Sequence, residues 1–486
     1  MCYNSRHKTI KRRNTPDLKP TKTYIQAILF VGVAALMLAT PAISLAQSAD
    51  AAADITEASQ SATKEDGRAV KRTRDGKVET YAEYEAGETF SLVWAAEVVV
   101  RTAYVKWYAL PDCAILVQSD EAGAELSRET IDEPSYNDVY AILPEARVLS
   151  ISCEDGMQIA EVTLYSEGVL PDEIHDWQPP LDKADLLVVS AHCDDELIFF
   201  GGTIPYYAGE RGLKVQVVYM ANGERARVDE ALNGLWHAGV RNTPVFLPLK
   251  DVYTETLRLA LLNWGEEETT RVLVEQIRRF QPEVIVTHDL DGEYGHGAHM
   301  ATASCVVNAV PQAADETAFP DSVAIDGAWQ TQKLYLHLYP EHQITMDWNQ
   351  PLSRFGGKTA LEVANEAYHM HVSQLEYHSN VYGEGDYSSL NYGLAFTAVG
   401  QDAAKDDFFE HVDPARLSNY VAPTPSPTLA ATATPVPTPA PEQTAETEAP
   451  MQSNRFSLFL IAGISAFVAA FSAAVAVVVL RKKKNK

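Results

Sequence analysis

A histidine and two aspartates follow the end of a hydrophobic run in the stretch LLVVSAHCDDE, residues 186–196. His192, Asp194 and Asp195 are polar groups that are costly to bury unless they find partners. The run itself is typical of a strand buried on both faces of a parallel sheet. Because ligands collect at the carboxyl ends of such strands, we expect these side chains to face a crevice.

A second hydrophobic run, VIVTH, ends at His288 and leads into HDLDGEYGHGAH. His296 and His299 are three residues apart, so a helix that begins near Gly295 would place both on one face. Two histidines and one aspartate can hold a catalytic zinc and leave a fourth position for water; Fe²⁺ is the alternative metal. The metal lowers the pKa of its water to about 7, a carboxylate beside that water can act as general base, and a further histidine can stabilise the oxyanion.

Each of these residues also has a purely structural explanation. A histidine that ends a strand is often a hydrogen-bonded core residue, and Asp194 and Asp195 suit the start of a helix. Histidines three apart also occur by chance. The joint occurrence of both motifs after two strands favours a metal site over these explanations.

Strand-like and helix-like segments alternate around both motifs. The alternation begins after the proline-marked junction DWQPPLDKAD, and the helix-like EETTRVLVEQIRRFQP closes with proline. This alternation of strands and helices predicts an α/β domain with a parallel sheet, which we assign to residues 179–420.

Short runs rich in β-branched residues precede this domain, and turn residues separate them. They predict a smaller β-sandwich over residues 73–178, after a polar spacer at residues 47–72. The ending IAEVTLYSEG resembles the last strand of discoidin-like carbohydrate-binding domains, so the sandwich either binds a glycan or supports the enzyme. Cys113 and Cys153 lie in this region and either pair or stay reduced.

Both ends of the chain predict a membrane context. Residues 1–46 combine a basic region, an apolar run and small residues at a cleavage site, as in a secretory signal peptide. An uncleaved N-terminal anchor is the alternative. The Pro- and Thr-rich residues 421–453 predict an extended stalk. Residues 454–486 contain an apolar run long enough for a transmembrane helix, followed by a basic cytoplasmic tail. We therefore expect an exported protein, anchored at the cell surface by its C-terminal segment.

The formal net charge of the 486-residue chain is −27. Nucleic acid is a poor candidate partner, because phosphate binding needs a basic face. The chain is 46% hydrophobic, which suits folded domains with sizeable cores.

The two motifs together resemble the PIG-L/LmbE family of zinc-dependent N-acetylglucosaminyl deacetylases. SAHCDDELIFFGG is similar to the family's AHPDDE signature, and VIVTHDLDGEYGHGAH is similar to its second motif, which ends in Tyr-Gly-His-x-x-His. The clear resemblance covers about residues 184–310. It implies a Rossmann-like α/β fold and the removal of an acyl group from an N-acyl glucosamine unit.

The resemblance also implies roles for individual residues. Asp194 matches the general base, His296 the histidine that stabilises the transition state, and Tyr294 a tyrosine that polarises the amide carbonyl. Arg227 matches a substrate-binding arginine, although Arg225 is close enough to fill the same role. Three residues match the zinc ligands: His192, Asp195 and His299.

One position departs from the family pattern, because Cys193 stands where the signature has proline. Proline stiffens the turn between the ligands, so the loop is expected to be less preorganised. Cys193 lies between His192 and Asp194, and we expect its side chain to point away from theirs and not to bind zinc. Glu196, the signature acid, is expected to support the site rather than to react.

These observations predict a metal-dependent amide hydrolase at the cell surface. Its expected substrates are N-acetylated glycans or glycoconjugates that contain GlcNAc. Two alternatives stay open: a catalytically inactive surface protein that binds glycans or mediates adhesion, and an amidase that acts on a larger N-acyl group.

Overall fold

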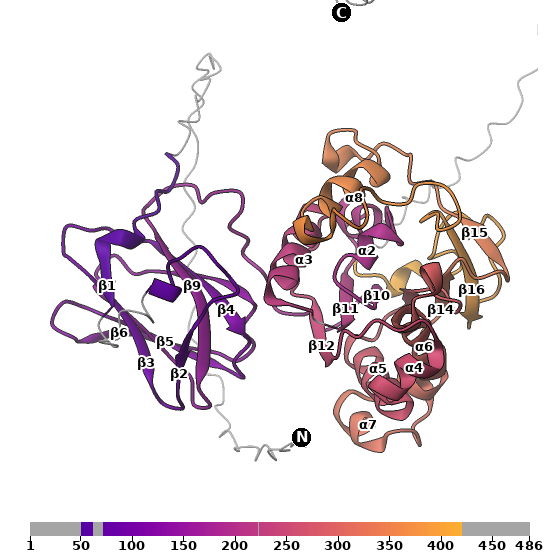
Figure 1. Cartoon of the computed structure of the whole chain (residues 1–486), viewed down its shortest axis with the longest axis horizontal. Helices are drawn as coiled ribbons and strands as arrows, with labels where there is room; N and C mark the ends of the chain where they lie inside the picture. Colours follow the sequence, from indigo (N-terminus) through magenta and orange to yellow (C-terminus); the bar gives the residue numbers. More distant parts are fainter. Residues whose placement is uncertain (1–49, 62–70, 222, 420–486) are drawn as a thin grey trace, which may run out of the picture. The chain divides into compact units, whose positions relative to one another are not determined.

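The computed structural model describes residues 50–61, 71–221 and 223–419 (Figure 1). The predicted signal peptide (residues 1–46), the stalk (421–453) and the transmembrane segment with its tail (454–486) lie outside these ranges. Among the described residues, none of the helices combines the length and the apolar character needed to cross a membrane.

The N-terminal part consists of two antiparallel sheets that share one hydrophobic core. Their strand orders are β1-β3-β8-β5-β6 and β2-β9-β4-β7. Inward residues of both sheets, such as Phe90 and Trp107, meet in this core, which is the arrangement expected of a β-sandwich. Cys113 and Cys153 are not joined by a disulfide. The strands are β1 (Ser59–Ser61), β2 (Ala82–Tyr84), β3 (Thr89–Trp94), β4 (Thr102–Ala109), β5 (Ala114–Ser119), β6 (Glu125–Ile131), β7 (Asn137–Ala141), β8 (Val148–Ser152) and β9 (Met157–Tyr165).

Residues 50–61 do not form the spacer that their composition predicted. β1 pairs antiparallel with β3, and Ala51 bridges to Val169. A polar segment of this kind is placed by backbone hydrogen bonds to a distant strand, which composition does not reveal.

The C-terminal part contains a seven-stranded sheet with the order β12-β11-β10-β13-β14-β16-β15. The five strands from β12 to β14 run parallel, which confirms the predicted parallel sheet, whereas β16 and β15 form an antiparallel edge that was not predicted. Chain order reverses between β10 and β13, and ligands bind at such a switch point in open α/β sheets. The strands are β10 (Leu186–Ser190), β11 (Val215–Ala221), β12 (Val245–Leu249), β13 (Val284–Thr287), β14 (Lys333–His337), β15 (Gln343–Thr345) and β16 (Asn391–Thr397).

Helices cover both faces of this sheet. Alternate residues of β10 feed two cores: Val188 packs in the core that includes residues of α3 and α8, and Val189 in the core that includes residues of α5 and α6. Figure 1 shows α3 and α8 grouped apart from α4, α5 and α6. The helices are α2 (Asp195–Ile198), α3 (Arg225–His237), α4 (Leu257–Trp264), α5 (Glu266–Phe280), α6 (Gly297–Ala314), α7 (Pro320–Asp326) and α8 (Ala360–Tyr368). Shorter helical turns are η1 (Thr56–Ala58), η2 (Pro205–Glu210), η3 (Glu293–Gly295), η4 (Ser353–Phe355), η5 (Val372–Gln374) and η6 (Pro414–Arg416).

Candidate metal centre and active site

The three predicted metal ligands converge beyond the ends of β10 and β13. Asp195 Oδ2 lies 2.9 Å from His192 Nδ1 and 3.2 Å from His299 Nε2. The two ring nitrogens lie 3.3 Å from each other. A tetrahedral zinc with bonds of about 2.0–2.1 Å needs ligand atoms about 3.3 Å apart. The triangle of donor atoms therefore fits such a metal.

The hydrogen bonds of His288, the histidine that follows β13, exclude it as a metal ligand. Within the described residues, two overlapping groups of side chains could hold a metal: one consists of His192, His296 and His299, and the other of Asp195, His288 and His299. His288 Nε2 accepts a hydrogen bond from the Ala191 N–H at 2.9 Å, and its Nδ1 lies 2.8 Å from Glu293 Oε2. A neutral imidazole has one acceptor nitrogen, so His288 has no lone pair left for a metal. The geometry favours His192, Asp195 and His299 as ligands.

Glu293, which the sequence did not single out, joins three histidines in a fully buried network. Its Oε2 lies 2.7 Å from His299 Nδ1, and its Oε1 lies 2.6 Å from His337 Nδ1. Burial alone would raise the pKa of the Glu293 carboxyl, but His288 and the hydrogen bonds from the histidines hold that pKa well below its usual range. An ionised carboxylate only accepts hydrogen bonds, so His299 points its Nδ1–H at Glu293, and Nε2 is the nitrogen that could face a metal. Although the ring is buried, Asp195 and Glu293 raise the pKa of His299 to about 10, so the ring is charged until a metal displaces the Nε2 proton.

We expect Glu293→Gln to weaken metal binding about 10- to 100-fold, because the neutral amide no longer fixes the tautomer of His299. Metal retained against graded concentrations of a chelator would measure this change. Glu316→Gln, at an exposed position, is the matched control. Equal retention in both variants would contradict the role of Glu293 as an orienting residue.

Asp194 has a strained backbone beside the ligands. Its φ is 139° and its ψ is −34°, a combination that is uncommon outside glycine and costs about 1–3 kcal/mol. The Asp194 N–H donates to Glu196 Oε2 at 2.8 Å, which helps to hold the loop in this conformation. Burial, with the charge of Asp195, raises the pKa of the Asp194 carboxyl to about 7 despite the nearby Arg227. A carboxylate with such a pKa suits a general base.

His296 is the N-cap of α6, which begins at Gly297, two residues after the helix start expected near Gly295. His296 Nδ1 accepts a hydrogen bond from the Ala298 N–H at 3.2 Å, which leaves Nε2 as the protonated nitrogen of the neutral ring. Burial and the charge of His299 lower the pKa of His296 to about 3. The ring centroid lies 4.5 Å from that of His299. His296 is therefore placed to donate a hydrogen bond beside the metal ligands.

Family comparison agrees with this geometry. Residues 187–310 match the family model PIG-L, described as GlcNAc-PI de-N-acetylase. This part of the chain is a PIG-L domain. The resemblance seen in the two motifs is thereby confirmed.

Two curated relatives are described as 1D-myo-inositol 2-acetamido-2-deoxy-α-D-glucopyranoside deacetylases. The protein from Rhodococcus opacus is 31% identical over 32% of this chain and 61% of its own length. The protein from Rhodococcus erythropolis is 32% identical over 31% of this chain and 59% of its own length. This chain thus spans less than two thirds of each relative. Among solved structures, an N,N′-diacetylchitobiose deacetylase from Pyrococcus horikoshii has a TM-score of 0.30 and 19% identity, over 41% of this chain and 74% of that one.

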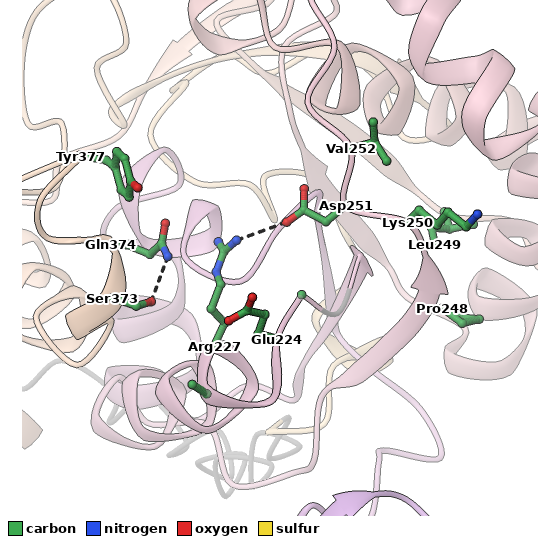
Figure 2. Close-up of a pocket in the computed structure, with 12 residues that line it drawn as sticks. Glu224, Arg227, Pro248, Leu249, Lys250, Asp251, Val252, Ser373, Gln374 and Tyr377 are labelled. Carbon is green, nitrogen blue, oxygen red and sulfur yellow. Dashed lines mark hydrogen bonds and ion pairs between the residues drawn. The ribbon is translucent and has the colours of Figure 1, made fainter. Parts of the chain in front are cut away.

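The structure separates the two candidate arginines of the PIG-L domain. Arg225 donates to the Trp107 carbonyl at 2.8 Å and to Asn137 Oδ1 at 2.9 Å, so its guanidinium is engaged with sandwich residues. Arg227 lies 3.3 Å from Asp194 Oδ1. It also lies 3.3 Å from Asp251 Oδ2, an ion pair drawn in Figure 2. Arg227 is therefore the arginine that can reach a substrate.

Six of the seven predicted site residues line one pocket, with a volume of about 360 Å³, while His299 is fully buried and does not line it. Tyr294, one of the six, is 41% exposed. Other lining residues come from segments that the motifs did not indicate: Asp251 and Tyr253 after β12, and Gln374, Tyr377 and His378 from η5 onward. Asp251 also approaches the ligand His192, because its Oδ1 lies 3.5 Å from His192 Nε2.

Cys193 lies away from the pocket. Its side chain is 1% exposed and packs in the core with Leu197, and burial raises the pKa of its thiol well above the usual range. Cys193→Ala is expected to leave the metal content unchanged and to lower the free energy of unfolding by about 1 kcal/mol. Elemental analysis and denaturant unfolding of both proteins would measure this. A large loss of metal would mean that the ligand set is misassigned.

Proposed function

We propose that the chain is a metal-dependent deacetylase that removes N-acetyl groups from GlcNAc-containing glycans or glycoconjugates. The observation that carries the proposal is the convergence of His192, Asp195 and His299 beside the buried carboxylate of Asp194. These residues place a metal-binding site next to a general base, and hydrolysis of an amide by a metal-activated water needs both.

Zinc or Fe²⁺ held by His192, Asp195 and His299 would supply a Lewis acid that acidifies water and polarises a carbonyl. Asp194 accepts a proton from the attacking water and passes it to the leaving amine, so that one amide and one water become one protonated amine and one acetate. His296 donates its Nε2–H to the oxyanion of the tetrahedral intermediate. Tyr294, at the rim, assists the polarisation of the carbonyl, and Arg227 binds the sugar.

Acetate release from GlcNAc glycoconjugates by the purified full-length chain in detergent tests this proposal. We expect release that a chelator abolishes and that added zinc restores. N-butanoyl glucosamine derivatives, assayed in parallel, would reveal an amidase for larger acyl groups. Glycan binding that needs no metal, without acetate release from any substrate, would overturn the enzymatic assignment.

We place this activity at the cell surface on the strength of the terminal segments of the sequence, residues 1–46 and 454–486. The test is digestion of intact cells by an added protease. Loss of the PIG-L domain from the cells would support export, and protection until lysis would contradict it.

A further inference from the structure

The start of α3 lacks the features that usually stabilise the N-terminus of a helix. Its N-cap, Glu224, makes no side-chain capping hydrogen bond, and its first turn contains no acidic residue. The turn carries instead Arg225 and Arg227, whose positive charges the helix dipole disfavours at this end. Contacts from outside α3 therefore have to hold the turn that carries Arg227.

The β-sandwich supplies such contacts to Arg225. The guanidinium donates from Nε to the Trp107 carbonyl at 2.8 Å and from Nη2 to Asn137 Oδ1 at 2.9 Å. Its central carbon lies 5.0 Å from the ring centroid of Tyr136, which is within the range of a cation–π interaction. Arg225 thus joins the first residue of α3 to β4 and to the start of β7.

Asp229, one turn further along α3, is held by the same face of the sandwich. Lys106 Nζ lies 3.1 Å from each carboxylate oxygen of Asp229, and Asn137 Nδ2 donates to Oδ1 at 3.0 Å. Lys106 on β4 and Asn137 on β7 lie directly opposite each other in the antiparallel pair, so their side chains share one face of the sheet. Burial alone would raise the pKa of the Asp229 carboxyl, but Lys106 and Arg225 hold that pKa below its usual value.

Arg227 lies on the opposite side of the same turn. Successive residues of a helix are about 100° apart, so Arg227 is about 160° around α3 from the two residues that contact the sandwich. Its guanidinium lies 3.3 Å from Asp194 Oδ1 and 3.3 Å from Asp251 Oδ2. Figure 2 shows this side chain reaching from α3 toward Asp251. The first turn of α3 therefore has sandwich contacts on one side and active-site contacts on the other.

We propose that Lys106 and Asn137 of the β-sandwich are positioning residues for the deacetylase site. They hold the first turn of α3 through Asp229 and Arg225, and this turn aims the Arg227 guanidinium at the pocket. Precise placement of such a group matters, because a displacement of about 1 Å can slow an enzyme up to about 100-fold. The inference rests on the proposed function only for the role of Arg227 in binding substrate.

The first test is hydrogen–deuterium exchange of the full-length chain in detergent, with Lys106→Met and Asn137→Ala beside the unsubstituted protein. The amides of residues 228–232 report on the start of α3, because Val228 donates the first hydrogen bond of the helix, to the Glu224 carbonyl. We expect these amides to exchange about tenfold faster in both variants, since each variant removes a partner of the buried Asp229 carboxylate.

Glu133→Gln is the matched control for this test. Glu133 also belongs to the sandwich and pairs with the PIG-L domain, but its exposed carboxylate lies 3.6 Å from Arg279 on α5. It should leave the exchange of α3 unchanged. Unchanged exchange in Lys106→Met and Asn137→Ala, or equal acceleration in Glu133→Gln, would overturn the proposal.

The second test asks whether the effect passes through Arg227. For acetate release from N,N′-diacetylchitobiose, Lys106→Met should lower kcat/KM about tenfold in the unsubstituted background. It should cause no further loss when Arg227→Met is already present, because residues that act through one another are not additive. Losses of equal size in both backgrounds would overturn the proposal, since the sandwich would then act independently of Arg227. Absence of acetate release from the unsubstituted protein would count against the proposed function, whereas hydrogen exchange would still decide whether the sandwich holds α3.

Discussion

Asp194→Asn is expected to lower kcat for acetate release by about 10²- to 10⁴-fold while the protein keeps its metal. An amide cannot accept the proton of the attacking water, and general-base catalysis contributes about this factor. Asparagine is preferable to alanine as the replacement, because it tolerates the positive φ of 139° better and preserves the side-chain shape.

Steady-state kinetics and elemental analysis of the same preparation would measure both halves of this prediction. Asp182→Asn is the matched control, because Asp182 is exposed and precedes β10, whereas Asp194 follows it. Turnover near that of the unsubstituted protein would exclude Asp194 as the base. Joint loss of metal and turnover would instead make Asp194 part of the metal site.

His299→Ala is expected to reduce the metal content from about one ion per chain to near zero. His299 Nε2 is one of the three donor atoms. Without it two protein ligands remain, whereas a catalytic zinc site has three. The substitution also removes one partner from each of the buried carboxylates of Asp195 and Glu293, which should lower the free energy of unfolding by about 1–3 kcal/mol.

Elemental analysis after extensive dialysis measures the metal, and circular dichroism shows whether the variant is folded. His369→Ala, at an exposed position, is the control. Because His299→Ala could unfold the domain, His192→Ala provides a second route to the same loss through a ligand with fewer buried contacts. Full metal content in either folded variant would refute the assigned ligand set.

The sequence alone predicted the parallel sheet, the two strand-end motifs and the residues that meet at the pocket. These predictions succeeded because the signals are local: hydrophobic runs mark the strands, and the carboxyl ends of parallel strands share one edge of a sheet. Residues 50–61 and the β15–β16 edge escaped prediction. Their positions depend on pairing with strands far along the chain, to which their own composition gives no clue.

Only the tertiary structure distinguished between residues of the same type. Four histidines lie in or near the motifs, and their hydrogen-bond partners separate His288, both of whose ring nitrogens are engaged, from His192 and His299, which stay candidates for metal binding. The choice of Arg227 over Arg225 likewise depends on neighbours from other segments.

The sequence by itself determined the chemistry that the chain can carry, because His192, Asp194, Asp195, His296 and His299 lie within two short stretches whose spacing constrains them. The tertiary structure decided the role of Glu293 and brought Asp251 next to His192 and Arg227. The reason is physical: a side chain's protonation, tautomer and accessible neighbours depend on groups that reach it through space, and folding brings those groups together from distant parts of the chain.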